Sequence, residues 1–199
     1  MSNELKYTSS IKDMPLMFSE MRRTALLLCD GKSGDEIVSL SLEKNIYQLE
    51  KEKRRRDVPL RMVKRLSTIG QPLVEIIARG HDGEAKLAAF LALMKSDRLL
   101  FEYMYEVYAD KFLSGHEEIY DKDFLEFIDR KAQNDETVAK WTSNNLAAVR
   151  SKIKSTLCDA GMAKRFSDIL FIQRPIADKK FIRLVNDEGS IYAKAMLLA

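Results

Sequence analysis

Apolar residues recur along most of the chain at the three- and four-residue spacing of amphipathic helices. The clearest run follows Asp57, where the apolar positions step by 4, 3, 4 and 3 residues: Met62, Leu66, Ile69, Leu73 and Ile76. Gly70-Gln71-Pro72 interrupts this run. The pattern therefore predicts two helices, the first capped by Asp57 with Pro59 in its first turn, and the second ending at Gly80.

The same spacing predicts helices on both sides of this pair, and short apolar runs bounded by turn residues predict strands. Ile169-Leu170-Phe171-Ile172, stopped by Pro175, is the one convincing strand. The sequence thus predicts a mainly α protein with one short β element. The other predicted helices cover about 13–31, 33–46, 83–95, 97–113, 121–133, 135–141, 142–161 and 178–188.

Ser114-Gly115-His116 is the predicted domain boundary. It separates an N-terminal helical bundle, 1–114, from a C-terminal region, 115–199. In the latter, a helix, a short helix and a longer helix precede a strand that follows a glycine-containing turn. This order is typical of a winged helix-turn-helix module, so we expect the C-terminal region to be winged-helix-like.

Charge is distributed far less evenly than the net charge of +3 suggests. Residues 50–66 hold eight basic and three acidic side chains, a net of +5. Residues 102–136 hold eleven acidic and four basic side chains, a net of −7, whereas 137–183 hold ten basic and three acidic, a net of +7. Such blocks predict contacts with charged partners.

The first basic region has the composition of a phosphate-backbone contact, because its cations are predicted to lie opposite the apolar stripe of a helix. Glu50 and Glu52 alternate with lysines at its start, so a solvated helix face is the alternative interpretation. The candidate DNA contacts here are Arg54, Arg55, Arg56, Arg61, Lys64 and Arg65.

The second basic region lies in the C-terminal block, where the helix from Thr142 would enter the major groove. Asn144 and Asn145 near its start are residue types that read base edges. Six cations are predicted to contact phosphates, from the short helix before this one, from this helix and from the start of a wing: Lys140, Arg150, Lys152, Lys154, Lys164 and Arg165. The alternative is a structural subdomain with a basic surface.

Motifs for catalysis are absent from the sequence. There is no Gly-rich phosphate loop, no Gly-x-Ser-x-Gly elbow and no dinucleotide fingerprint. His81 and His116 stand alone, and Cys29 and Cys158 lie far apart in apolar helical contexts, typical of small buried residues in a reducing cytoplasm. We expect no enzymatic activity, no cofactor and no metal site.

No N-terminal leader is evident, and the longest apolar stretches, TALLLC and LAAFLALM, are far shorter than the roughly 18–20 residues that span a bilayer. The sequence therefore predicts a cytoplasmic protein without a membrane segment.

Four stretches give the chain a family resemblance: YTSSIKDMPLMFSEM, LLLCDGKSGDEIV, MVKRLSTIG and KWTSNNLAAVRSKIKSTLCDAGMA. With these, the chain resembles the A protein of BREX bacteriophage-defence systems. The resemblance implies a small cytoplasmic, all-helical protein with an architecture similar to the NusB antitermination fold. It also implies binding of double-stranded DNA without enzymatic activity. It transfers no residue-level DNA motif, so every candidate contact rests on charge and helix geometry.

Three hypotheses follow from these patterns. The leading one is a DNA-binding accessory protein of phage defence that contacts mainly phosphates through both basic regions. The second is an assembly adaptor whose acidic and basic blocks dock other BREX proteins or pair head to tail. The third is an RNA-binding protein, suggested by the antitermination-like architecture. A preferred DNA sequence and the oligomeric state are not predicted.

Overall fold

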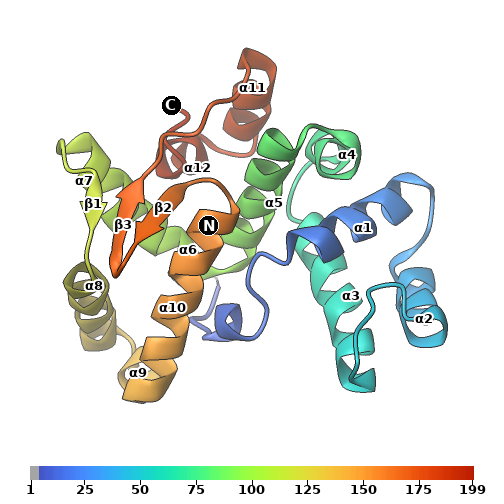
Figure 1. The fold of residues 1–199 in the computed structure, drawn as a ribbon, viewed down its shortest axis with the longest axis horizontal. Helices are drawn as coiled ribbons and strands as arrows, with labels where there is room; N and C mark the ends of the chain where they lie inside the picture. The colour runs from blue at the N-terminus through green and yellow to red at the C-terminus, as the bar shows by residue number, and fades with distance from the viewer. Residues whose placement is uncertain (1–4) are drawn as a thin grey trace. The chain divides into compact units, whose positions relative to one another are not determined.

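A computed structural model describes residues 5–199, which fold into two compact units (Figure 1). The helical unit is Leu16–Ser96. The composite unit joins the segment that ends at Pro15 to Asp97–Ala199. The domain boundary predicted near residue 114 falls inside the composite unit. This division arises because the helices after Asp97 pack with C-terminal elements and with the N-terminal segment.

The helical unit is a bundle in which α1 packs on α3 and α4, α2 packs on α3, and α4 packs on α5. The apolar stripe predicted from the 4, 3, 4 spacing is buried from Met62 to Leu73, as expected. The predicted break at Gly70-Gln71-Pro72 is confirmed. The helices are α1 (Phe18–Cys29), α2 (Gly34–Lys44), α3 (Glu52–Leu66), α4 (Gln71–Arg79) and α5 (Asp82–Ser96).

Helix α3 begins earlier than predicted, at Glu52 rather than after Asp57. Pro59 therefore lies inside the helix, where it has no N–H to donate to the carbonyl of Arg55. The buried hydroxyl of Ser41 on α2 donates to that carbonyl instead, at 2.6 Å. A neighbouring helix thus replaces the missing hydrogen bond, and the basic residues 53–56 are helical.

Replacing Ser41 by alanine should lower the free energy of unfolding by about 1–2 kcal/mol, because the Arg55 carbonyl would lose its replacement donor. Urea titration followed by circular dichroism measures this change. Ser39→Ala, at an exposed position of the same helix, is the control and should change stability by less than about 0.5 kcal/mol. Equal effects of the two substitutions would contradict the assigned role of Ser41.

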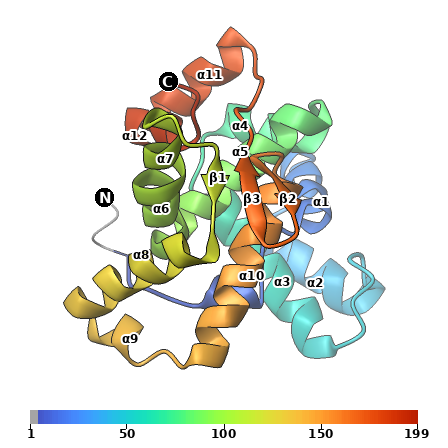
Figure 2. The same cartoon turned by 60° about the vertical axis from the view of Figure 1, so that its left-hand side comes forward.

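The composite unit contains one long helical stretch, a small sheet and several further helices (Figure 2). The predicted helix at 97–113 is continuous, but its centre is π-helical. The elements are η2 (Ser10–Lys12), α6 (Arg98–Tyr103), η3 (Met104–Ala109), α7 (Asp110–Leu113), β1 (Glu118–Ile119), α8 (Asp121–Asn134), α9 (Glu136–Ala139), α10 (Ser143–Asp159), β2 (Ala163–Phe166), β3 (Ile169–Ile172), α11 (Lys179–Asp187) and α12 (Ser190–Ala195).

The sheet has the strand order β1-β3-β2 with antiparallel neighbours. Strand β3 is the strand that the sequence predicted. The expectation of a single β element is wrong, since β1 and β2 pair on either side of β3. Both were missed because β1 has only two residues and β2, Ala-Lys-Arg-Phe, lacks an apolar run. The mainly α fold class is confirmed.

Helix α10 begins where the sequence predicted. The Thr142 hydroxyl accepts a hydrogen bond from the Asn145 backbone N–H at 3.3 Å, which caps the helix. On its buried side α10 presents Val149, Ile153 and Leu157. The buried hydroxyl of Tyr108 lies 2.6 Å from the Met162 carbonyl and 2.9 Å from the Gln173 carbonyl, so η3 holds both ends of the β2–β3 hairpin. These bonds fix the hairpin on η3, and β2 also packs against α10.

Within residues 5–199, no helix is long and apolar enough to cross a bilayer.

Candidate nucleic-acid interface

The basic region of α3 is mainly, but not wholly, at the surface. Arg56 and Lys64 are exposed, whereas Arg54, Arg55 and Arg61 are half-buried. The Arg55 Nε donates to the Leu49 carbonyl at 2.8 Å, which fixes its guanidinium on the protein. The Arg56 Nε lies 3.3 Å from Asp57, an exposed pair of little energetic weight.

Arg65 does not belong to this surface, because its side chain is only 2% exposed. It lies on the same side of α3 as the buried Met62 and Leu66. The helical spacing places Arg65 one position from the apolar stripe, and packing within the bundle covers it. Burial removes this guanidinium from any surface that a duplex could contact.

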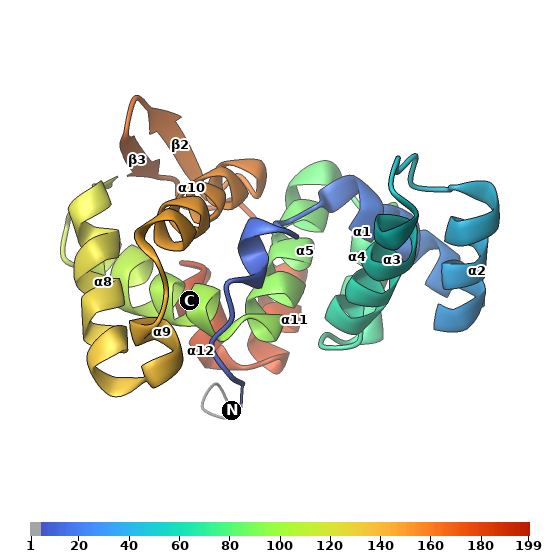
Figure 3. The same cartoon turned by 90° about the horizontal axis from the view of Figure 1, so that it is seen from below.

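The second basic region centres on α10 and the β2–β3 hairpin, which lie side by side in Figures 2 and 3. Asn144 is exposed in the first turn of α10. The Asn145 side chain is less free to contact a base edge, since its Oδ1 already accepts a hydrogen bond from Lys12 Nζ at 2.7 Å. Lys12 lies on η2, so Asn145 attaches the N-terminal segment to α10.

Lys154 is a buried structural residue. Its side chain is 7% exposed, its Nζ donates to the Asp168 carbonyl at 2.6 Å, and the same nitrogen forms an ion pair with Asp121. Arg150 lies 3.4 Å from the same carboxylate. The acidic and basic sequence blocks therefore meet here, because Asp121 at the start of α8 neutralises cations of α10.

The remaining candidates of this region are exposed. Lys140 forms only a solvated pair with Glu136, at 3.2 Å. Lys152 lies on the exposed side of α10, and Lys164 and Arg165 lie on β2. The Arg165 Nε donates to the Ser167 carbonyl at 2.7 Å, which folds this side chain over the hairpin turn. Lys140, Asn144, Lys152, Lys164 and Arg165 together form what we call the α10–hairpin surface.

Sequence reasoning missed one residue of this surface. Phe166, the last residue of β2, is 76% exposed. A lone phenylalanine next to Lys164 and Arg165 was the only available signal, and it could not show whether the ring is covered.

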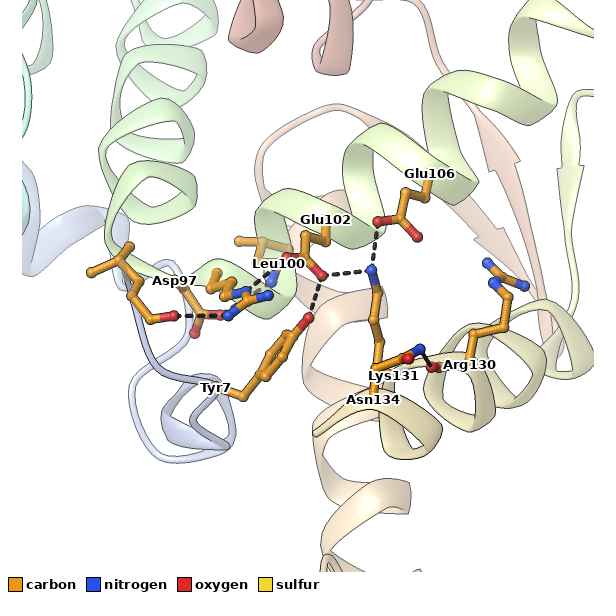
Figure 4. A network of polar contacts seen from close by, with 10 residues as sticks. Tyr7, Asp97, Leu100, Glu102, Glu106, Arg130, Lys131 and Asn134 are labelled. Carbon is orange, nitrogen blue, oxygen red and sulfur yellow. Dashed lines mark hydrogen bonds and ion pairs between the residues drawn. The ribbon is translucent and has the colours of Figure 1, made fainter. Parts of the chain in front are cut away.

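A separate polar network lies on α6 and α8 (Figure 4). The Glu102 carboxylate accepts from the Tyr7 hydroxyl at 2.6 Å and from Arg98 Nε at 2.8 Å, and it pairs with Lys131 at 2.6 Å. Lys131 also pairs with Glu106 at 2.5 Å. These residues border a hollow of about 530 Å³. Within the composite unit, the network attaches the N-terminal segment to α6 and α8.

Burial disfavours the charged form of Glu102, but the hydrogen bonds from Lys131, Tyr7 and Arg98 outweigh burial and lower the pKa of this carboxyl. Burial and the bond to Glu102 raise the pKa of Tyr7, so its hydroxyl remains a donor. The carboxylates of Glu102 and Glu106 thus have donors in Tyr7, Arg98 and Lys131. The network therefore has the properties of an ion-pair cluster that stabilises the fold.

The lowered pKa of Glu102 predicts an acid-sensitive stability. The contribution of the ionised carboxylate is complete above its usual pKa of 4.5 and is lost as the pH falls through the lower folded-state pKa. Glu102→Gln should therefore flatten the loss of melting temperature below pH 4.5. Glu126→Gln, at an exposed position of α8, should leave the acid limb unchanged. Identical acid limbs for wild type and Glu102→Gln would contradict the assignment.

The two cysteines and the potential metal ligands are the remaining candidates for chemistry. Cys29 and Cys158 are free and half-buried, so they are less buried than the sequence predicted. Burial raises the pKa of the Cys158 thiol, which lowers its reactivity. Among residues 5–199, no group of three or more His, Cys, Asp or Glu side chains is placed to hold a metal ion.

Comparison with known proteins decides the family. The BrxA family model matches residues 5–189, nearly the whole chain. The chain belongs to the BrxA family. A BREX protein BrxA from Bacillus cereus (strain H3081.97) is 32% identical over 189 residues, which cover 95% of this chain and 94% of that protein. The resemblance seen in the sequence is confirmed.

The BrxA fold is also found in a solved structure. The crystal structure of an uncharacterized protein from Magnetospirillum magneticum superposes with a TM-score of 0.82 at 18% identity, and the match covers 98% of this chain and 100% of that one. At this identity the similarity shows a shared fold alone.

Proposed function

We propose that this BrxA-family protein is a non-enzymatic accessory component of BREX phage defence that binds double-stranded DNA mainly through phosphates. The observation that carries the proposal is the α10–hairpin surface. Lys152 and Asn144 lie exposed on α10, Lys164 and Arg165 lie exposed on the neighbouring hairpin, and the exposed Lys140 lies just before α10. Such a surface supplies the sequence-independent attraction that dominates DNA affinity.

The element order supports a winged-helix mode of binding. A strand, β1, precedes the helices α8, α9 and α10, and the β2–β3 hairpin follows them. In winged helix-turn-helix modules the last of these helices enters the major groove. Asn144 in the first turn of α10 would then face base edges, with Lys140 and Lys152 next to phosphates.

The basic face of α3 is the second proposed contact. Arg54, Arg56, Arg61 and Lys64 are its candidate phosphate contacts, because Arg65 is buried and Arg55 is held by the Leu49 carbonyl. In the composite unit, Lys154 and Asn145 position other elements, and Arg150 is partly neutralised by Asp121. The proposed interface is therefore smaller than the sequence predicted.

Salt dependence tests this proposal. If each of the two basic regions engages about three phosphates, the log of the association constant for a random duplex should fall by ~5 per tenfold rise in salt. Fluorescence anisotropy from 50 to 300 mM salt measures this slope. A flat response would contradict phosphate-dominated binding, and no binding at the lowest salt would favour the adaptor hypothesis.

Competition separates DNA from RNA. An unlabelled DNA duplex should displace the labelled duplex more effectively than an RNA duplex of equal length, because side chains enter the A-form major groove poorly. Stronger competition by RNA would favour the RNA-binding hypothesis.

A further inference from the structure

The tip of the β2–β3 hairpin presents one large apolar side chain to solvent. Phe166 is 76% exposed, whereas Ile169, its partner across the hairpin, is half-buried. Leu170 and Ile172 of β3 are buried. The exposed apolar surface at the tip is thus essentially one aromatic ring, which is far smaller than a stable protein–protein interface requires.

The tip is held in place by hydrogen bonds. A two-residue turn, Ser167-Asp168, joins the paired residues Phe166 and Ile169, and Ser167 adopts a left-handed conformation with φ +54°. The buried Lys154 Nζ donates to the Asp168 carbonyl at 2.6 Å, and Arg165 donates to the Ser167 carbonyl at 2.7 Å. An aromatic ring on an anchored turn loses little conformational entropy when it binds.

Positive charge flanks the ring on its own strand. Because side chains alternate along a strand, Lys164 lies on the same face of β2 as Phe166, and Arg165 lies on the other face. The only acidic side chain of the turn, Asp168, is 3.4 Å from the Arg165 guanidinium and is partly neutralised by it. The tip therefore combines an exposed aromatic ring with adjacent cations. This combination suits DNA, whose phosphates are anionic and whose stacked bases are apolar.

We propose that Phe166 is a minor-groove wedge that inserts between adjacent base pairs of duplex DNA, with Lys164 and Arg165 on the flanking phosphates. Apolar side chains that enter the minor groove partly unstack a base step and bend the duplex. Flexible pyrimidine–purine steps are the easiest to open, so the wedge favours TA and CA steps. This proposal rests on the proposed function and adds to it a preferred site of deformation.

The test uses the full-length protein and a duplex with 2-aminopurine beside a central TA step. Wild type should raise the 2-aminopurine fluorescence on binding, and end-labelled duplexes should show increased energy transfer as they bend. Phe166→Ala should abolish both signals and weaken binding about tenfold, while the salt slope stays unchanged because no phosphate contact is lost. Ile176→Ala, which truncates a side chain that is 95% exposed and lies outside the hairpin, should behave as wild type.

Three outcomes would overturn the wedge. If Phe166→Ala binds and bends DNA as wild type does, the wedge is wrong and the proposed function stands. If wild type prefers single-stranded DNA to the duplex, Phe166 stacks on unpaired bases instead. If wild type binds no DNA at low salt, the proposed function fails and the wedge fails with it. Unchanged melting temperatures for both variants exclude misfolding as the cause.

Discussion

Replacing Lys154 by methionine should lower the free energy of unfolding by about 2–3 kcal/mol, a loss typical of removing a hydrogen bond from a buried charged group. The substitution removes the donor to the Asp168 carbonyl and the counter-charge of Asp121. The methionine side chain fills similar volume, so the loss reports the missing interactions rather than a cavity. Guanidinium titration monitored by circular dichroism measures it.

Lys152→Met is the matched control, since Lys152 lies on the exposed side of the same helix. Its stability should change by less than about 0.5 kcal/mol. Its DNA affinity should fall instead, because Lys152 belongs to the α10–hairpin surface. Equal stability of the Lys154 and Lys152 variants would contradict the view that Lys154 anchors the hairpin.

Removing the exposed cations of the α10–hairpin surface should have the largest effect on binding. Lys140, Lys152, Lys164 and Arg165 replaced together by alanine should weaken duplex binding at least a hundredfold at 50 mM salt, since about four phosphate contacts would be lost. Stability should change little, because these side chains are exposed and their ion pairs are weak. Anisotropy titration and thermal unfolding measure the two quantities.

A parallel variant tests α3. Arg56, Arg61 and Lys64 replaced by alanine should also weaken binding, by less than the four-site variant because fewer cations are removed. Full loss of binding in the α3 variant, with normal binding by the four-site variant, would show that α3 is the interface and would contradict the primary role of α10.

The helices were predictable where local signals act alone. The Thr142 cap, the Gly70-Gln71-Pro72 break and the apolar strand β3 each follow from a few adjacent residues. The start of α3 was not predictable, because Asp57 and Pro59 are good start signals. The helix nevertheless begins earlier, because the Ser41 hydroxyl on another helix donates to the Arg55 carbonyl, which Pro59 leaves without a donor.

The candidate site was predictable in composition but not in detail. Charge and spacing selected α3, α10 and the hairpin, but they could not separate exposed cations from buried ones. Arg65 and Lys154 have the same sequence signal as Lys64 and Lys152. What distinguishes Lys154 is the position of Asp121 and of the Asp168 carbonyl, and only the tertiary fold brings these groups together.

The salt slope of DNA binding, compared between wild type and the four-site α10–hairpin variant, tests the central claim most directly. If these cations contact phosphates, the slope of log K against log salt should decrease by about 3–4 in the variant, since each lost contact removes ~0.9. Equal slopes for two proteins of equal stability would contradict the account, because the α10–hairpin surface would then not be where the protein holds DNA.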